Sequence, residues 1–208
     1  MASKFQHLAS VLILGLFILL AFGSDDSNPE IQGINEKIIE DKLTPEQRDS
    51  INTVRAENKL KAEKALKSFK KNVDEFEGTT FYSDPRTPNY TNVNFIYPYI
   101  GVKDDHAWLR LKMQYTSDNW LFINNAILLI DDEKFYISGN WERDNNSQIW
   151  EWLDIQVRQN EYSILEKIAS SKSAKIRYEG NQYYKDRNIT SKEKSIIKKT
   201  LEIYDLLK

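Results

Sequence analysis

The chain of 208 residues has no cysteine, only two histidines (His7 and His106) and seven glycines. Without cysteine it has no disulfide, no thiolate nucleophile, no cysteine-ligated zinc and no lipidated cysteine anchor. Because His7 lies in the N-terminal apolar segment, the sequence argues against histidine catalysis and a multi-histidine metal site. The glycines form no phosphate-binding loop, and no serine stands in a nucleophile elbow. We therefore expect neither a cofactor nor a metal.

The net charge and the aromatic content further restrict the class of protein and its expected partners. The formal net charge is −2, so the chain has no global field for a polyanion and nucleic acid is not an expected partner. Aromatic residues make up 12% of the chain, which argues against disorder across the main body. This length suits one domain with appendages.

The first 23 residues have the pattern of an export signal. Lys4 supplies the positive charge, Val11–Phe22 is almost purely apolar, and Ala21-Phe22-Gly23 resembles a cleavage site. The alternative is an uncleaved transmembrane helix over residues 5–24, which are long enough to span a bilayer. Both alternatives place the rest of the chain outside the cytoplasmic membrane, either periplasmic or extracellular, or membrane-anchored with the C-terminal domain outside.

Residues 24–43 are polar and are interpreted as a tether. Residues 44–77 are predicted to form a long helix, with Thr44 and Gln47 as a capping box and Gly78 as the C-cap. The first half of this helix is polar nearly all round, which suits a stalk. The second half carries an apolar stripe that predicts docking on the domain.

Residues 78–208 are predicted to form an α+β domain. Trp120–Ile130 is the longest mostly apolar run outside the N-terminus and is interpreted as a central strand, or two short strands around Asn124-Asn125. A tight turn at Asp131–Lys134 makes it one arm of a hairpin. We expect an antiparallel sheet of five to seven strands, packed against a C-terminal helix and preceded by the long N-terminal helix.

Local patterns define other elements of this domain. Ala107–Tyr115 alternates between apolar and polar residues, which predicts a half-buried antiparallel strand. Gly180-Asn181 is a turn pair between two further strands. Thr190 and Glu193 are predicted to form the capping box of the C-terminal helix.

Three phrases add a resemblance: DNWLFI, IWEWLD and IRYEGNQYYKDRNIT, in this order before a final helix. Over about residues 78–208 they resemble a group of uncharacterised bacterial exported or membrane-tethered proteins. The resemblance implies a location in the bacterial cell envelope. It brings no activity.

The strongest catalytic candidate is the carboxylate pair Glu151 and Asp154, beside Trp150 and Trp152. Flanking aromatic residues raise a carboxylate pKa and line sugar sites, as glycoside hydrolysis requires. The same alternation is also that of an ordinary half-buried strand. The pair therefore supports only the alternative function, an enzyme that acts on envelope glycans.

The favoured hypothesis is a non-catalytic, secreted or tethered envelope protein that binds a partner protein or an anionic surface or polymer. Acids outnumber bases between Asp131 and Glu166, and bases outnumber acids from Lys167 onward. Such a basic segment can bind an anionic polymer or lipid headgroups, unless the two segments neutralise each other in the fold. The candidate binding residues are Lys175, Arg177, Tyr183, Lys185 and Arg187.

Overall fold

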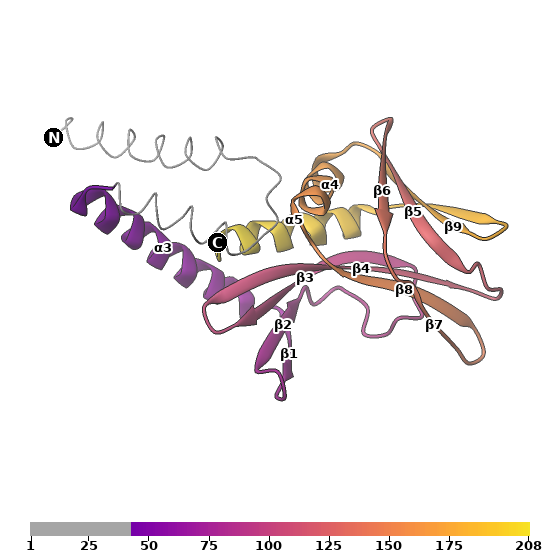
Figure 1. The fold of residues 1–208 in the computed structure, drawn as a ribbon, viewed down its shortest axis with the longest axis horizontal. Helices are drawn as coiled ribbons and strands as arrows, with labels where there is room; N and C mark the ends of the chain where they lie inside the picture. Colours follow the sequence, from indigo (N-terminus) through magenta and orange to yellow (C-terminus); the bar gives the residue numbers. More distant parts are fainter. Residues whose placement is uncertain (1–42) are drawn as a thin grey trace. The chain divides into compact units, whose positions relative to one another are not determined.

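The computed structural model describes residues 43–208 (Figure 1). The predicted signal segment and all but the last residue of the tether lie outside these residues. The chain divides into units 1–57 and 58–208, and the second unit carries every strand of the described part. No helix of residues 43–208 is both long and apolar enough to cross a membrane.

Helix α3 (Pro45–Leu66) begins as predicted and ends eleven residues earlier than the predicted Glu77. Its capping box is present, since the Gln47 side chain accepts from the Thr44 N–H at 2.9 Å. Its first half, in residues 43–57, belongs to the other unit. In the second unit, Ala62 and Leu66 are buried in the core, as the apolar stripe predicts.

The segment after Leu66 corrects the predicted long helix. It forms strand β1 (Lys70–Asp74), which pairs with β2 (Thr79–Ser83) in a hairpin. The Asp74 carboxylate accepts hydrogen bonds from two N–H groups of the turn. Gly78 has a φ of +65°, so it belongs to this turn and does not cap a helix. Phe76 is fully exposed. The apolar residues that are spaced three and four apart in this segment therefore do not form the buried stripe of a helix.

Six antiparallel strands form the first sheet, in the order β1-β2-β3-β4-β8-β7 (Figure 1). The remaining four are β3 (Phe95–Lys103), β4 (His106–Ser117), β8 (Ile149–Gln156) and β7 (Glu142–Asn145). The alternation predicted for β4 is confirmed, since Leu109, Leu111 and Met113 are buried. The face that carries them is called the inner face of this sheet, and the opposite one its outer face.

Four antiparallel strands form a second sheet, in the order β10-β9-β5-β6. They are β10 (Tyr184–Asn188), β9 (Ala174–Gly180), β5 (Ile123–Ile130) and β6 (Glu133–Ser138). The predicted hairpin is confirmed, and its two turn residues, Asp131 and Asp132, have φ of 42° and 76°, as a two-residue turn with left-handed residues requires. β5 has a partner on each side and a bulge at Ile123–Asn125.

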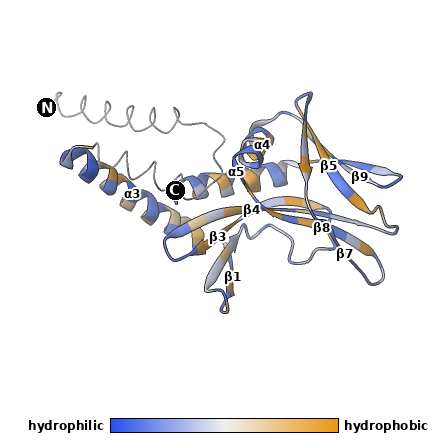
Figure 2. Cartoon of the chain, viewed as in Figure 1, coloured by the Kyte–Doolittle hydropathy of each residue, from blue (hydrophilic) through white to orange (hydrophobic). Residues whose placement is uncertain are grey.

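Both sheets turn one face to a shared core. Leu128 and Ile176 of the second sheet lie in the same apolar cluster as Leu111 and Leu153 of the first. Apolar and hydrophilic residues are mixed along the strands of both sheets (Figure 2), as expected where only one face is buried. The predicted α+β class is confirmed, with a second sheet in addition to the predicted one.

Helices α4 (Gln159–Ser170) and α5 (Ser191–Asp205) pack against each other, and α5 also packs against β3. The predicted capping box of Thr190 and Glu193 is present. β2 pairs only with the last part of β3, and the Ile96 N–H donates instead to the Glu193 carboxylate at 2.9 Å. Glu193, in the first turn of α5, thus accepts a hydrogen bond from the edge of β3, and its carboxylate lies beside β10.

Candidate functional site

The β9–β10 hairpin divides the predicted basic patch between two faces. Lys185 pairs with Tyr178, and Arg187 pairs with Ile176, so both cations share the buried face of the second sheet. Lys175 and Arg177 are opposite Asn188 and Asp186, on the outer face of this sheet. Tyr183 lies in the turn and is 71% exposed. The four cations therefore do not project from one side of the hairpin, which was the condition for a single basic patch.

The physical reason is the even number of residues in the hairpin loop. Glu179 pairs with Tyr184, so every odd-numbered residue of β9 stands opposite an even-numbered residue of β10. Because neighbouring side chains alternate between faces, the four odd-numbered cations fall on two faces. A two-residue turn at Gly180-Asn181 implies the same division.

On the outer face, Arg177 is neutralised. Its Nε and Nη2 donate to the two Asp186 oxygens at 2.7 Å each, and its guanidinium lies 3.9 Å from the centre of the Tyr184 ring. The hydrogen bond from Arg177 lowers the pKa of Asp186 despite the opposing effect of burial. The bidentate pair neutralises Arg177. Lys175 and, on β6, Lys134 remain on this face without a carboxylate bonded to them among residues 43–208.

On the buried face, Lys185 and Arg187 line a hollow of about 430 Å³ with Tyr178, between β10 and the end of β4. Its other lining residues are Asn94, Tyr115, Thr116, Ser117 and Asp186. We call this space the β10 hollow. Lys185 is exposed, and within residues 43–208 it forms no ion pair. The hollow therefore has a cation at its rim and hydroxyl, amide and aromatic groups around it.

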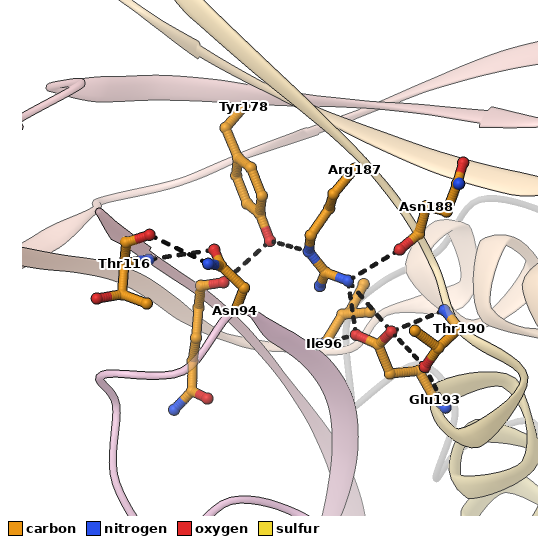
Figure 3. A network of polar contacts seen from close by, with 9 residues as sticks. Asn94, Ile96, Thr116, Tyr178, Arg187, Asn188, Thr190 and Glu193 are labelled. Carbon is orange, nitrogen blue, oxygen red and sulfur yellow. Dashed lines mark hydrogen bonds and ion pairs between the residues drawn. The ribbon is translucent and has the colours of Figure 1, made fainter. Parts of the chain in front are cut away.

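Arg187 lines this hollow and is held in place by polar contacts, which Figure 3 shows. Its Nη1 lies 2.8 Å from a Glu193 oxygen, and its Nε donates to the Tyr178 hydroxyl at 3.3 Å. Burial lowers the pKa of Arg187, but the neighbouring Tyr178 and Glu193 more than offset this, and its pKa is raised overall. Its side chain is 18% exposed and stays charged at any physiological pH.

Tyr178 links the two sheets. Its hydroxyl donates to the Gln114 carbonyl at 3.0 Å, and its ring lies 5.4 Å from that of Tyr115 (Figure 3 shows the hydroxyl). Burial raises the pKa of Tyr178 above its ordinary value of 10, so the phenol stays protonated. It acts as a hydrogen-bonding group here and does not titrate near neutral pH.

One donor of this network has no partner. The Nη2 of Arg187 is buried and makes no hydrogen bond within the described residues. A buried donor left unpaired costs about 1–3 kcal/mol, so such a group is normally paired by water or a ligand. The hollow thus has an exposed, unpaired ammonium at its rim and, beneath its surface, an unpaired guanidinium donor, a combination that suits an anionic oxygen group.

Glu151 and Asp154 lie on opposite faces of the six-stranded sheet, three residues apart on β8. Asp154 is on the outer face, where it bonds Tyr99 and Arg110. Glu151 is fully buried and accepts hydrogen bonds from three consecutive backbone N–H groups, those of residues 121–123, at 2.7–2.9 Å. The two carboxylates therefore cannot act on one glycosidic bond. Within residues 43–208, no three His, Asp or Glu side chains are grouped as metal ligands.

Sequence reasoning found Lys185, Arg187 and Glu193, the last only as a helix cap. It missed Asn94, Thr116 and the end of β4, because their proximity to β10 depends on the packing of two sheets. Comparison of the chain with protein-family models, with curated proteins and with solved structures found no match. The site must therefore be interpreted from its own geometry.

Proposed function

We propose that this chain is an exported, non-catalytic binding protein of the cell envelope that holds an anionic group of an envelope polymer in the β10 hollow. The observation that supports it is the pair of cations at the hollow. Lys185 has no ion-pair partner within the described residues, and Arg187 keeps one unpaired donor. Carboxylate and phosphate oxygens are the groups that such donors bind best.

The fixed position of Arg187 supports binding in particular. Glu193 and Tyr178 hold the guanidinium before any ligand arrives, so little side-chain entropy is lost on binding. Glu193 also cancels the charge of Arg187, which leaves Lys185 as the main attraction. We therefore expect weak binding that depends on salt, because an exposed charge is screened over about 8–10 Å at ordinary ionic strength.

The experiment uses the full chain and three soluble polymers: polyglutamate, polyphosphate and the neutral dextran. Affinity is measured by calorimetry at about 50 mM and 500 mM salt, where the screening length differs severalfold. We expect binding to one or both anionic polymers, weaker at high salt, and none to dextran. The two anionic polymers distinguish a carboxylate from a phosphate ligand.

The chain offers a matched control on the same hairpin. Lys185→Gln removes the cation at the hollow, and Lys175→Gln removes an exposed cation on the opposite face. We expect at least a fivefold loss of affinity for the first and no change for the second. Equal effects of the two substitutions, or equal affinity for charged and neutral polymers, would overturn the proposal.

A further inference from the structure

The outer face of the six-stranded sheet carries a second, chemically different surface. Register places several aromatic rings and one ion pair on it, across β2, β3, β4 and β8. We call this surface the aromatic face, and its residues are Phe81, Tyr99, Trp108, Arg110, Trp152 and Asp154. All six are partly exposed. The β10 hollow shares none of them.

The Trp108 indole leans over Gly101, which stands opposite to it on β3. A Cβ at Gly101 would stand only 2.4–2.7 Å from three atoms of the Trp108 indole, so the ring covers the space that a side chain would fill. The Phe81 ring meets the indole edge-on at 6.3 Å and 89°. The His106 ring stacks on it at 5.7 Å and 22°. Contacts with Gly101, Phe81 and His106 therefore hold the indole in one position on the aromatic face.

A polar cluster stands beside the rings. The Tyr99 hydroxyl donates to both oxygens of Asp154 at 2.8 Å, and the Arg110 Nε donates to the same carboxylate at 2.9 Å. Burial and the adjacent carboxylate raise the pKa of Tyr99 above its ordinary value of 10, so the phenol keeps its proton. Arg110 and Asp154 remain 31% and 19% exposed.

The ion pair makes the centre of the aromatic face polar. Arg110 and Asp154 cancel in charge and both stay partly exposed, and Lys112, which stands opposite Asp154 on the same face, adds one positive charge. A protein partner that packed dry against this face would have to desolvate the pair, which is costly. The core of a protein interface is also depleted of charged residues. The face therefore favours a ligand that brings its own hydroxyl groups.

We propose that the aromatic face binds a neutral glycan chain. The C–H face of a sugar ring packs on the Trp108 indole, and its hydroxyls bond Arg110 and Asp154. Three neighbouring cross-strand rows of this face, from the row that contains Gly101 to the row that contains Asp154, have no aliphatic side chain. Rings alternate there with hydrogen-bonding groups, as the two kinds of surface of a sugar require.

The test uses the full chain with chitohexaose, cellohexaose and maltohexaose, and measures affinity by calorimetry. We expect at least one of these neutral hexasaccharides to bind with an affinity that is insensitive to salt. Trp108→Ala and Asp154→Asn should each weaken this binding at least tenfold. Tyr136→Ala, which removes a 58% exposed ring from the outer face of the other sheet, should leave it unchanged.

Trp108→Phe keeps a ring over Gly101 and replaces Trp108→Ala in the test if that variant does not fold. It should lose less affinity for the hexasaccharide, about threefold. Lys185→Gln should not change hexasaccharide binding, which separates this surface from the β10 hollow. The proposal is overturned if none of the three hexasaccharides binds. It is also overturned if the Trp108 and Asp154 variants bind like the unmodified chain.

Discussion

Replacing Glu151 by alanine should destabilise the fold more than any substitution at an exposed carboxylate. Glu151 is fully buried, and it accepts hydrogen bonds from the N–H groups of Leu121, Phe122 and Ile123 at 2.8, 2.9 and 2.7 Å. Arg143 adds an ion pair at 2.9 Å. The Phe122 φ of 54° turns these N–H groups toward one point. Glu151 thus ties β8 to the start of β5.

The magnitude follows from what the substitution leaves behind. Each unpaired buried donor costs about 1–3 kcal/mol, and breaking a buried ion pair costs about 3–5 kcal/mol. These costs overlap, and Arg143, which is 32% exposed, regains water. We therefore expect a loss of about 3–5 kcal/mol, a large part of the 5–15 kcal/mol that a domain typically has.

Urea unfolding followed by tryptophan fluorescence measures this loss as a shift of the midpoint at constant slope. Glu142→Ala on β7 is the matched control, because that side chain is exposed, and its effect should stay within about 0.5 kcal/mol. A loss below about 1 kcal/mol for Glu151→Ala would refute the role assigned to the carboxylate.

Three further predictions follow from the same structure. Leu128→Ala should cost about 2–5 kcal/mol because Leu128 is fully buried, whereas Leu129→Ala should cost clearly less, and equal urea midpoints for the two would contradict the orientation of β5. Burial raises the pKa of Asp84, but the bonds and charge of Arg86 outweigh this and leave it below 3.8. The contribution of Asp84 is therefore present at neutral pH and lost as pH falls through the lowered value, and Asp84→Asn should weaken the acid dependence of the unfolding midpoint. A reporter fused after Lys208 should be active outside the cytoplasmic membrane, and activity confined to the cytoplasm would contradict export.

Local patterns predicted most of the elements correctly. The alternation in β4, the Asp131-Asp132 turn and the two capping boxes at Thr44 and Thr190 each depend on residues close in sequence. The second sheet could not be predicted in the same way. β5 pairs with β9 some fifty residues later, and apolar runs do not specify which partner they choose.

The end of α3 was predicted incorrectly because two signals conflicted. Val73 and Phe76 continue a helical spacing, but both are exposed. Val73 pairs with Thr80 as part of an extended strand, and Phe76 lies in the turn between β1 and β2. Tertiary pairing overrides a weak local preference.

Only part of the candidate site was predicted from the sequence. The basic residues were found, but the even hairpin loop divides them between two faces, and that division follows from the predicted turn itself. Asn94 and Thr116 could not be predicted, because they reach the hollow through a pair of hydrogen bonds between the residue before β3 and the end of β4.

The location of the bound anion tests the proposed function most directly. Backbone amide shifts of the isotope-labelled full chain are followed by NMR during titration with polyglutamate, and in parallel with polyphosphate. We predict shifts at Thr116, Ser117, Lys185 and Arg187 around the β10 hollow with at least one of the two polymers, and none at Lys175. Shifts centred on Lys175 instead, or no shifts with either polymer, would contradict the proposal.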